Sequence, residues 1–208
     1  MGGRGAVYVD AFNLYYGSLR GTPYRWLNLD KLCTFLLPEL DISVIRYFTA
    51  IVGSRPDDPR QQQRQQAYLR ALATLPKVTV HYGFFLTKRV RLPLADPPPL
   101  GPRTVEVLRT EEKGSDVNLA THLLADGFRG HYDVAAVISN DSDLREPIEV
   151  VRRDLGLQVG IVNPDATARR SALPGDFHRR IRERQLRACQ FPNTIRDRHG
   201  VVYRPVGW

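Results

Sequence analysis

The chain has 208 residues, of which 42% are hydrophobic, so it can form one sizeable folded core and is not a disordered segment. No apolar run reaches the length of a membrane span, and Met1-Gly2-Gly3-Arg4 leads straight into an apolar segment, which predicts that no signal peptide is present. Thirty basic residues against 22 acidic ones give a net charge of +8, which favours polyanionic partners. A basic composition without functional meaning is the alternative.

The hydrophobic pattern predicts strands that alternate with helices. The predicted strands cover residues 6–9, 42–52, 77–85, 132–139 and 157–162. The predicted helices begin near 28–30, 57–58, 115 and 146, and end before Pro38, at Leu75, at Gly127 and before Gly156. This order predicts a doubly wound α/β fold with a mostly parallel five-stranded sheet, in which ligands bind at the carboxyl ends of the strands.

Three segments do not fit this alternation. Residues 14–25 are rich in Tyr, Gly and Arg and are predicted to form a loop. Residues 86–109 contain a proline run and are predicted to form an inserted hairpin, either a mobile surface element or a basic flap over the site. Residues 164–208, with a basic helical stretch over 177–188 and a short strand at 201–203, are predicted to be an extension packed on a main domain of residues 1–163.

Acidic residues follow the predicted strands at one edge of the sheet. Asp10 ends the first strand, Asp141 and Asp143 follow the fourth, and Asp116 lies in the first turn of the helix before it. Helix capping is an alternative explanation for Asp116 and Asp143. No helix is predicted directly after Asp10, so capping explains that residue poorly. We therefore expect these acids to converge on one cleft.

Converging carboxylates repel one another unless they bind a cation. Hard oxygen ligands suit Mg²⁺ or Mn²⁺. Such an ion lowers the pKa of a bound water and polarises a phosphoryl oxygen, which predicts hydrolysis of a phosphodiester. The five histidines show no zinc-binding spacing. The two cysteines, Cys33 and Cys189, are far apart, which predicts a reducing compartment and favours the cytoplasm.

The acidic positions also show a family resemblance. Asp10-x-x-Asn13, Glu112-Lys113-Gly114-Ser115-Asp116-Val117 and Ser139-Asn140-Asp141-Ser142-Asp143-Leu144 resemble the motifs of NYN domains. NYN domains are PIN-like nucleases with a five-stranded doubly wound sheet. The tail segments Cys189-Gln190-Phe191-Pro192 and Arg204-Pro205-x-x-Trp208 are similar to those of the bacterial members, so the resemblance covers nearly the whole chain.

The resemblance implies a metal-dependent ribonuclease that uses Mg²⁺ or Mn²⁺. Asp10, Asp116 and Asp141 match the acidic positions of the family, and Asn13 matches an amide that fixes the loop and the neighbouring ligands. Asp143 matches a second acid in the strand-four motif. Many relatives carry a further Asp where this chain has His122, which leaves open whether one or two metal ions bind.

Contacts with RNA are predicted from aromatic and basic residues. Tyr15, Tyr16 and Tyr24 follow Asp10 and either stack unpaired bases or pack their loop onto the sheet. Lys113 is a candidate phosphate contact. Arg179 and Arg180, in the basic stretch, are further candidates. A protein partner or a homodimer is compatible with the sequence.

Two other function classes compete with the nuclease. The first is a non-catalytic RNA-binding regulatory module, which the His122 departure favours. The second is a phosphatase or receiver-like domain with an aspartyl nucleophile. Phe12 argues against it, because the Asp-x-Asp pair of haloacid-dehalogenase-type phosphatases is absent.

Overall fold

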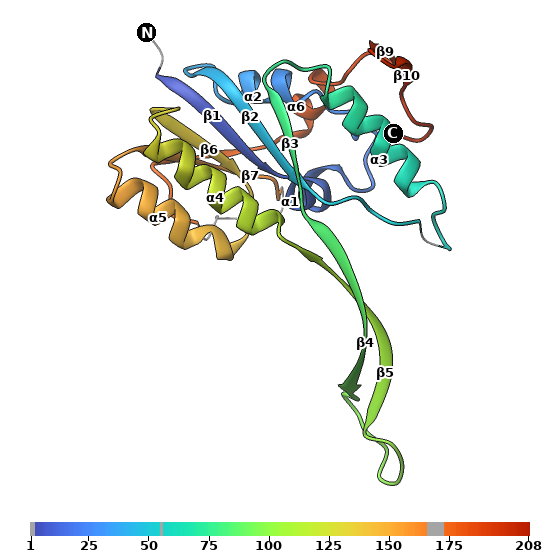
Figure 1. Ribbon diagram of the computed structural model, residues 1–208. Coiled ribbons are helices and arrows are strands. Elements are labelled where there is room, and N and C mark those ends of the chain that lie inside the picture. The colour runs from blue at the N-terminus through green and yellow to red at the C-terminus, as the bar shows by residue number, and fades with distance from the viewer. Residues whose placement is uncertain (1–2, 55, 166–172) are drawn as a thin grey trace.

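The computed structural model describes residues 3–54, 56–165 and 173–208. Its centre is a six-stranded sheet in the order β3-β2-β1-β6-β7-β8, with every pairing parallel (Figure 1). The strands are β1 (Arg4–Asp10), β2 (Asp41–Thr49), β3 (Val78–Tyr82), β6 (Val134–Ile138), β7 (Gln158–Asn163) and β8 (Phe177–Arg180). The chain order reverses between β1 and β6, so the predicted doubly wound α/β fold is confirmed and its switch point lies between these strands.

Helices cover both faces of the sheet (Figure 1). They are α2 (Leu29–Leu36), α3 (Gln61–Leu72), α4 (Ser115–Phe128), α5 (Arg145–Arg153) and α6 (Glu183–Ala188). Successive side chains of β1 alternate between the two layers: Val7 and Val9 belong to the core beneath α2, α3 and α6, whereas Ala6 and Tyr8 belong to the core beneath α4 and α5. All five residues of β6 are buried, as expected for a central strand covered on both faces.

The sixth strand corrects the prediction of five strands and of helix over 177–188. Residues Phe177–Arg180 form β8, and only Glu183–Ala188 are helical. The cause is a contact between β7 and β8. Gly160 pairs with Phe177, and a Cβ at Gly160 would lie 2.0 Å from Cζ of Phe177. The ring therefore occupies the space that the glycine leaves. The boundary predicted between 163 and 164 stays a prediction.

The loop predicted for residues 14–25 is partly helical. A short helix α1 (Ala11–Leu14) follows β1 directly and continues into a π-helix η1 (Tyr15–Leu19). Leu14 and Leu19 are both buried, and their spacing of five residues matches the i to i+5 repeat of a π-turn rather than the α-helical repeat. This wider turn keeps both leucines in the core.

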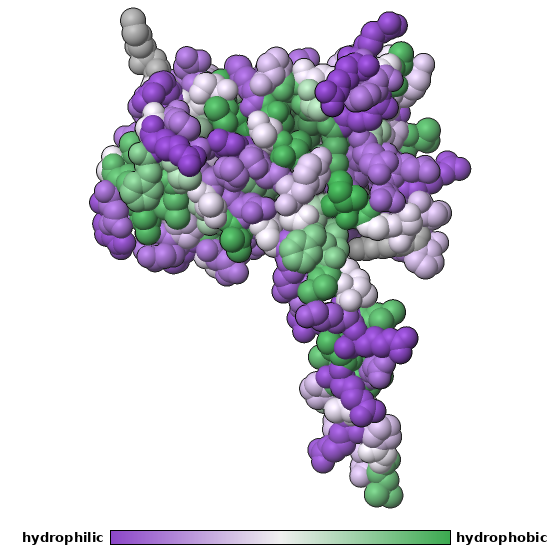
Figure 2. Space-filling model, viewed as in Figure 1, coloured by the Kyte–Doolittle hydropathy of each residue, from purple (hydrophilic) through white to green (hydrophobic). Residues whose placement is uncertain are grey.

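The inserted segment forms a two-stranded antiparallel ribbon that projects from the body. Its strands β4 (Phe84–Pro93) and β5 (Thr104–Lys113) are longer than the predicted hairpin. Figure 1 shows the ribbon extending away from the sheet, and Figure 2 shows polar and apolar residues mixed along it. At its base the ring of Phe85 packs edge-on against that of Phe12 in α1, with 5.8 Å between the centroids. The base of the ribbon therefore lies beside the end of β1.

The C-terminal segment packs beside α2 and α3. It contains α6 and a hairpin of β9 (Thr194–Asp197) and β10 (Gly200–Tyr203), and the strand predicted at 201–203 is part of β10. The ring of Trp26 contacts Phe191 and Trp208. Within the described ranges, no helix has both the length and the apolar character needed to span a membrane.

Candidate metal centre

Asp10 lies at the carboxyl end of β1 and is only 4% exposed. It is the N-cap of α1: Asn13 N–H donates to its Oδ1 at 3.0 Å, and the Ser139 hydroxyl donates to its Oδ2 at 2.9 Å. The expectation that capping explains Asp10 poorly was therefore wrong. Burial nevertheless raises the pKa of Asp10 in spite of these hydrogen bonds, so its negative charge is only partly compensated.

A network of hydrogen bonds joins the ends of β1 and β6. The Asn140 N–H donates to Oδ1 of Asn13 at 3.1 Å, which ties α1 to the segment after β6. The Asp141 N–H donates to the Ser139 hydroxyl oxygen at 3.1 Å, so Ser139 bridges Asp10 and Asp141. The two acidic motifs therefore hold each other in place.

Asp116 reaches the same edge from the first turn of α4. The turn before this helix needs Gly114, whose φ is +93°. Glu112 accepts hydrogen bonds from the Ser115 N–H at 3.1 Å and from the Ser115 hydroxyl at 2.7 Å, and so satisfies the start of the helix. The Asp116 carboxylate has no hydrogen-bond partner among the described residues, which leaves its oxygens available to a ligand.

The three acids converge as predicted. Asp10, Asp116 and Asp141 each offer one ligand oxygen, and these oxygens all lie within 4.8 Å of one another. Burial and the charges of Asp10 and Asp141 raise the pKa of Asp116 to about 6. This repulsion is relieved when a cation binds, and an all-oxygen donor set fits a hard divalent ion. The cluster, which we call the acidic triad, could therefore bind a divalent metal.

Comparisons with known proteins agree with the geometry. The model of the NYN domain family matches residues 4–178, which includes all three acids of the acidic triad. The chain belongs to the NYN domain family.

Two further comparisons concern single proteins. The NYN domain described here is 31% identical over 236 residues to 6-hydroxy-3-succinoylpyridine 3-monooxygenase HspA of Pseudomonas putida, covering 99% of this chain and 75% of that protein. The crystal structure of VPA0982, a protein of unknown function from Vibrio parahaemolyticus, superposes with a TM-score of 0.54 at 15% identity. That match covers 88% of this chain and 94% of the other, and supports the fold alone.

Asp143 and Lys113 lie near the acidic triad but outside it. Asp143 is exposed; its N–H donates to Oδ1 of Asp141 at 3.0 Å, and its charge is among those that raise the pKa of Asp116. Lys113 ends β5, and its Nζ lies 3.0 Å from Oε2 of Glu111. The lysine therefore already has an acidic partner, and a phosphate would compete with Glu111 for it.

The three predicted tyrosines and His122 have different surroundings. Tyr15 is half-buried against the core, and Tyr16 is 56% exposed with the Arg20 guanidinium 5.5 Å from its ring centroid. Tyr24 instead donates a hydrogen bond to Glu183 at 2.8 Å. His122 packs against His81 on β3, with 4.0 Å between the ring centroids, and its lowered pKa keeps it neutral at pH 7.

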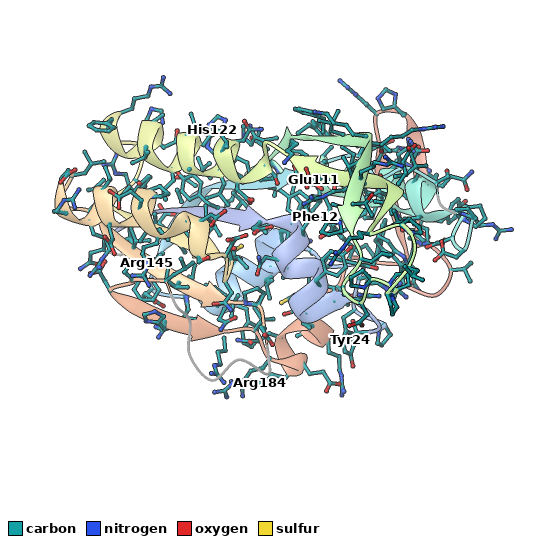
Figure 3. The ribbon with its side chains drawn as sticks, turned by 90° about the horizontal axis from the view of Figure 1, so that it is seen from below. Phe12, Tyr24, Glu111, His122, Arg145 and Arg184 are labelled. Atoms are coloured by element: carbon teal, nitrogen blue, oxygen red, sulfur yellow. The ribbon has the colours of Figure 1, made fainter. Side chains whose placement is uncertain are left out.

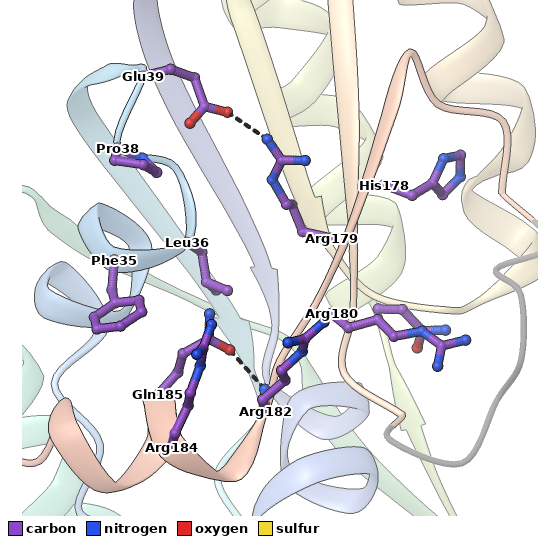
Figure 4. Close-up of a pocket in the computed structure, with 11 residues that line it drawn as sticks. Phe35, Leu36, Pro38, Glu39, His178, Arg179, Arg180, Arg182, Arg184 and Gln185 are labelled. Carbon is purple, nitrogen blue, oxygen red and sulfur yellow. Dashed lines mark hydrogen bonds and ion pairs between the residues drawn. The ribbon is translucent and has the colours of Figure 1, made fainter.

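Arg179 and Arg180 are separate from the acidic triad. They lie on β8, two strands from β6, and line an open groove of about 770 Å³ between α2, β8 and α6 (Figure 4). Arg179 is paired with Glu39 at 3.1 Å. Arg182 and Arg184 also line the groove, which is therefore a basic surface separate from the acidic triad.

Sequence reasoning missed two residues that position the acids. Ser139 bridges Asp10 and Asp141, and Glu112 accepts hydrogen bonds from Ser115 at the start of α4. The reversed order of Glu112-x-x-Ser115 does not match the Ser-x-x-Glu capping box, so the sequence carried no standard signal for this contact. Figure 3 shows Phe12 close to the base of the ribbon, and His122 farther along α4.

The stability of the metal-free protein is expected to fall as pH rises through about 6. The pKa of Asp116 is about 6 in the folded protein and near 3.8 in the unfolded chain, so folding favours the protonated form of this carboxyl group. The stability that protonated Asp116 contributes is fully present below about pH 4 and is lost as the pH rises through the pKa of the folded state. We expect a loss of about 1 kcal/mol between pH 5 and pH 7.5, after allowing for partial solvent screening.

Denaturant unfolding in the presence of a chelator measures this effect. The difference between wild type and Asp116→Asn isolates Asp116 from the other titrating groups. Identical pH profiles for the two proteins would contradict the assignment.

Proposed function

We propose that this NYN domain is a metal-dependent endoribonuclease that hydrolyses RNA phosphodiester bonds. The observation that carries the proposal is the convergence of Asp10, Asp116 and Asp141 at the carboxyl edge of a domain from the PIN-like nuclease superfamily. The net charge of +8 supports a polyanionic substrate, because it favours association with phosphate. The free thiols of Cys33 and Cys189 are compatible with a cytoplasmic location.

In this proposal the acidic triad holds Mg²⁺ or Mn²⁺. When bound, such an ion lowers the pKa of a coordinated water and polarises a phosphoryl oxygen. Asn13 and Ser139 act as positioning residues, because they hold Asp10 and the segment that carries Asp141 in one arrangement. Asp143 adds negative charge at the exposed side of the cluster.

RNA contacts are assigned to groups around this edge. Lys113 gives up its ion pair with Glu111 and contacts an RNA phosphate near the acidic triad instead. The groove with Arg179 and Arg180 binds a more distant part of the strand through its phosphates. Tyr16, with its exposed ring, stacks on an unpaired base.

Incubation with a mixed RNA pool, with and without Mn²⁺, tests the proposal. We expect cleavage that requires Mn²⁺ and falls at least about 100-fold in Asp141→Asn, because a neutral amide replaces one of the three anionic ligands. Asp154→Asn is the matched control: Asp154 is a surface residue at the end of α5, away from the carboxyl edge, and its one ion pair within the described residues is with Arg153. Cleavage by Asp141→Asn at the wild-type rate would contradict the assignment. Salt-sensitive RNA binding without products would favour the non-catalytic binding module.

A second candidate function follows from the relative in Pseudomonas putida. That protein is named as a monooxygenase of a substituted pyridine, and its similarity covers 99% of this chain. Such a reaction places one oxygen atom of O₂ on the ring and reduces the other to water with two electrons from a donor. We rank it second, because the acidic triad lacks the two histidines typical of iron(II) oxygenase sites. Consumption of O₂ and NADH that depends on an aromatic acid would favour it over the nuclease.

A further inference from the structure

A partly enclosed cavity of about 150 Å³ lies next to α1, and we call it the aromatic pocket. Its aromatic lining consists of Phe12, Tyr15, Tyr16, Tyr47, Tyr68, Phe85 and Trp208. A cavity of about this size in another protein binds benzene, so the volume suits one six-membered ring. Aromatic side chains favour a planar ligand, because they offer flat faces and edges for stacking.

Polar groups of the aromatic pocket lack a hydrogen-bond partner within the described residues: the buried indole Nε1 of Trp208, and the hydroxyls of Tyr47 and Thr49. Tyr47 and Thr49, near the carboxyl end of β2, are 8% and 2% exposed and line the cavity. Neither hydroxyl forms a hydrogen bond with any residue in the described ranges. A buried polar group without a partner costs free energy, and a ring with polar substituents would supply the missing bonds.

The neighbouring wall of the aromatic pocket is held rigidly. Gln65 accepts a hydrogen bond from the Val52 N–H at 2.9 Å and donates one to the Ala50 carbonyl at 2.8 Å. Arg64 is paired with Asp58. The segment after β2 is therefore fixed to α3, which preserves the shape of the cavity.

The aromatic pocket adjoins the acidic triad. Phe12 lines the cavity only two residues after Asp10, and Tyr47 pairs across the sheet with Val9. Burial and the nearby Asp10 carboxylate both raise the pKa of Tyr47.

The pocket wall also carries an uncompensated positive charge. Arg25 donates to the backbone carbonyls of Thr22 and Gly207, stacks on Trp208, and forms no ion pair within the described ranges. Its charge therefore favours an anionic group attached to the ligand.

We propose that the aromatic pocket binds a single six-membered aromatic ring, and that this ring is a pyrimidine base of the RNA strand held at the acidic triad. The assignment to a base rests on the proposed nuclease function. The hydroxyls of Tyr47 and Thr49 bond to the polar edge of the ring, and Arg25 attracts a phosphate of the strand. A purine has two fused rings and exceeds the single-ring volume. A free monocyclic aromatic acid shares the ring chemistry and is the competing source.

Binding of free nucleotides tests the proposal without cleavage. Calorimetric titration of the full chain with UMP and with AMP is expected to give at least about tenfold tighter binding of UMP. Tyr47→Phe and Thr49→Val each remove one hydroxyl and keep the side-chain volume, and each should weaken UMP binding about fivefold. Tyr203→Phe and Thr194→Val change exposed residues of the β9–β10 hairpin and are matched controls with no expected effect. Thermal unfolding confirms that all variants are folded.

The outcomes separate the pocket from the nuclease. Equal binding of UMP and AMP, or no effect of the two pocket variants, overturns the proposal. Nicotinate that binds in a Thr49-dependent way while UMP does not would overturn the assignment to RNA and place a free acid in the pocket. UMP binding with the expected variant effects but no RNA cleavage would refute the nuclease function alone. Cleavage without any base preference would refute the pocket proposal alone.

Discussion

Asp116→Asn is expected to lose metal-dependent RNA cleavage by about 10³-fold and to make the metal-free protein more stable at pH 8. The loss corresponds to about 4 kcal/mol, which is within the several kcal/mol that a bound ion contributes to catalysis. In the wild type, burial and the charges of Asp10 and Asp141 raise the pKa of Asp116 to about 6, and the gain follows because a neutral amide avoids both the burial of a charge and the repulsion. Asp116 is the best choice among the three acids, because it has no hydrogen bond to lose within the described ranges.

Thermal unfolding at pH 8 without metal measures the gain in stability, and repeating it with Mn²⁺ tests metal binding. Mn²⁺ should stabilise the wild type and leave Asp116→Asn nearly unchanged, since a ligand stabilises only the state that binds it. The Asp154→Asn control should respond to Mn²⁺ as the wild type does. A variant that still gains stability from Mn²⁺ would show that the ion binds elsewhere.

Asp126→Ala is expected to destabilise the protein by about 3–5 kcal/mol, because it leaves the partly buried Arg46 guanidinium and the buried Tyr8 hydroxyl without their acceptor. Asp126 in α4 is 1% exposed and accepts two hydrogen bonds from Arg46 at 2.6 and 2.9 Å and one from the Tyr8 hydroxyl at 2.8 Å. Burial opposes its ionisation, yet the bonds from Arg46 and Tyr8 hold the pKa of Asp126 below its ordinary value.

The neighbours of Arg46 cannot replace Asp126. Burial and the nearby His122 and Arg46 lower the pKa of His81 to about 4, so His81 is neutral at pH 7 and offers no negative charge. Urea unfolding at pH 7 measures the loss. Asp133→Ala is the matched control: Asp133 also makes a two-pronged contact with an arginine, Arg4, but that pair is exposed to solvent and should contribute far less to stability. Equal losses in the two variants would contradict the role assigned to burial.

The sequence predicted the acidic triad because topology alone brings its members together. Asp10 and Asp141 each follow a strand with a strong apolar signal, and the carboxyl ends of parallel strands share one edge. The first turn of a helix that starts at that edge adds Asp116. None of these placements depends on the detailed packing of side chains. The hydrophobic periodicity and the order of strands and helices were therefore sufficient to predict the acidic triad.

Features that depend on contacts between distant residues were not predictable in this way. The four-residue helix α1 is too short to show a periodic pattern, so the capping role of Asp10 was missed. Strand β8 exists because Phe177 fits over Gly160, and its basic sequence favoured helix instead. The aromatic pocket draws residues from α1, β2, α3 and the chain end, which only the folded structure brings together.

Single-turnover cleavage of a labelled single-stranded RNA, measured over a range of Mn²⁺ concentrations, tests the central claim most directly. The wild type should cleave at a rate that rises with Mn²⁺ and saturates, and Asp116→Asn, purified in the same way, should be slower by about 10³-fold at every concentration. Equal rates for the two proteins, or cleavage that persists in the presence of a chelator, would contradict the assignment of the acidic triad as a metal-dependent nuclease centre.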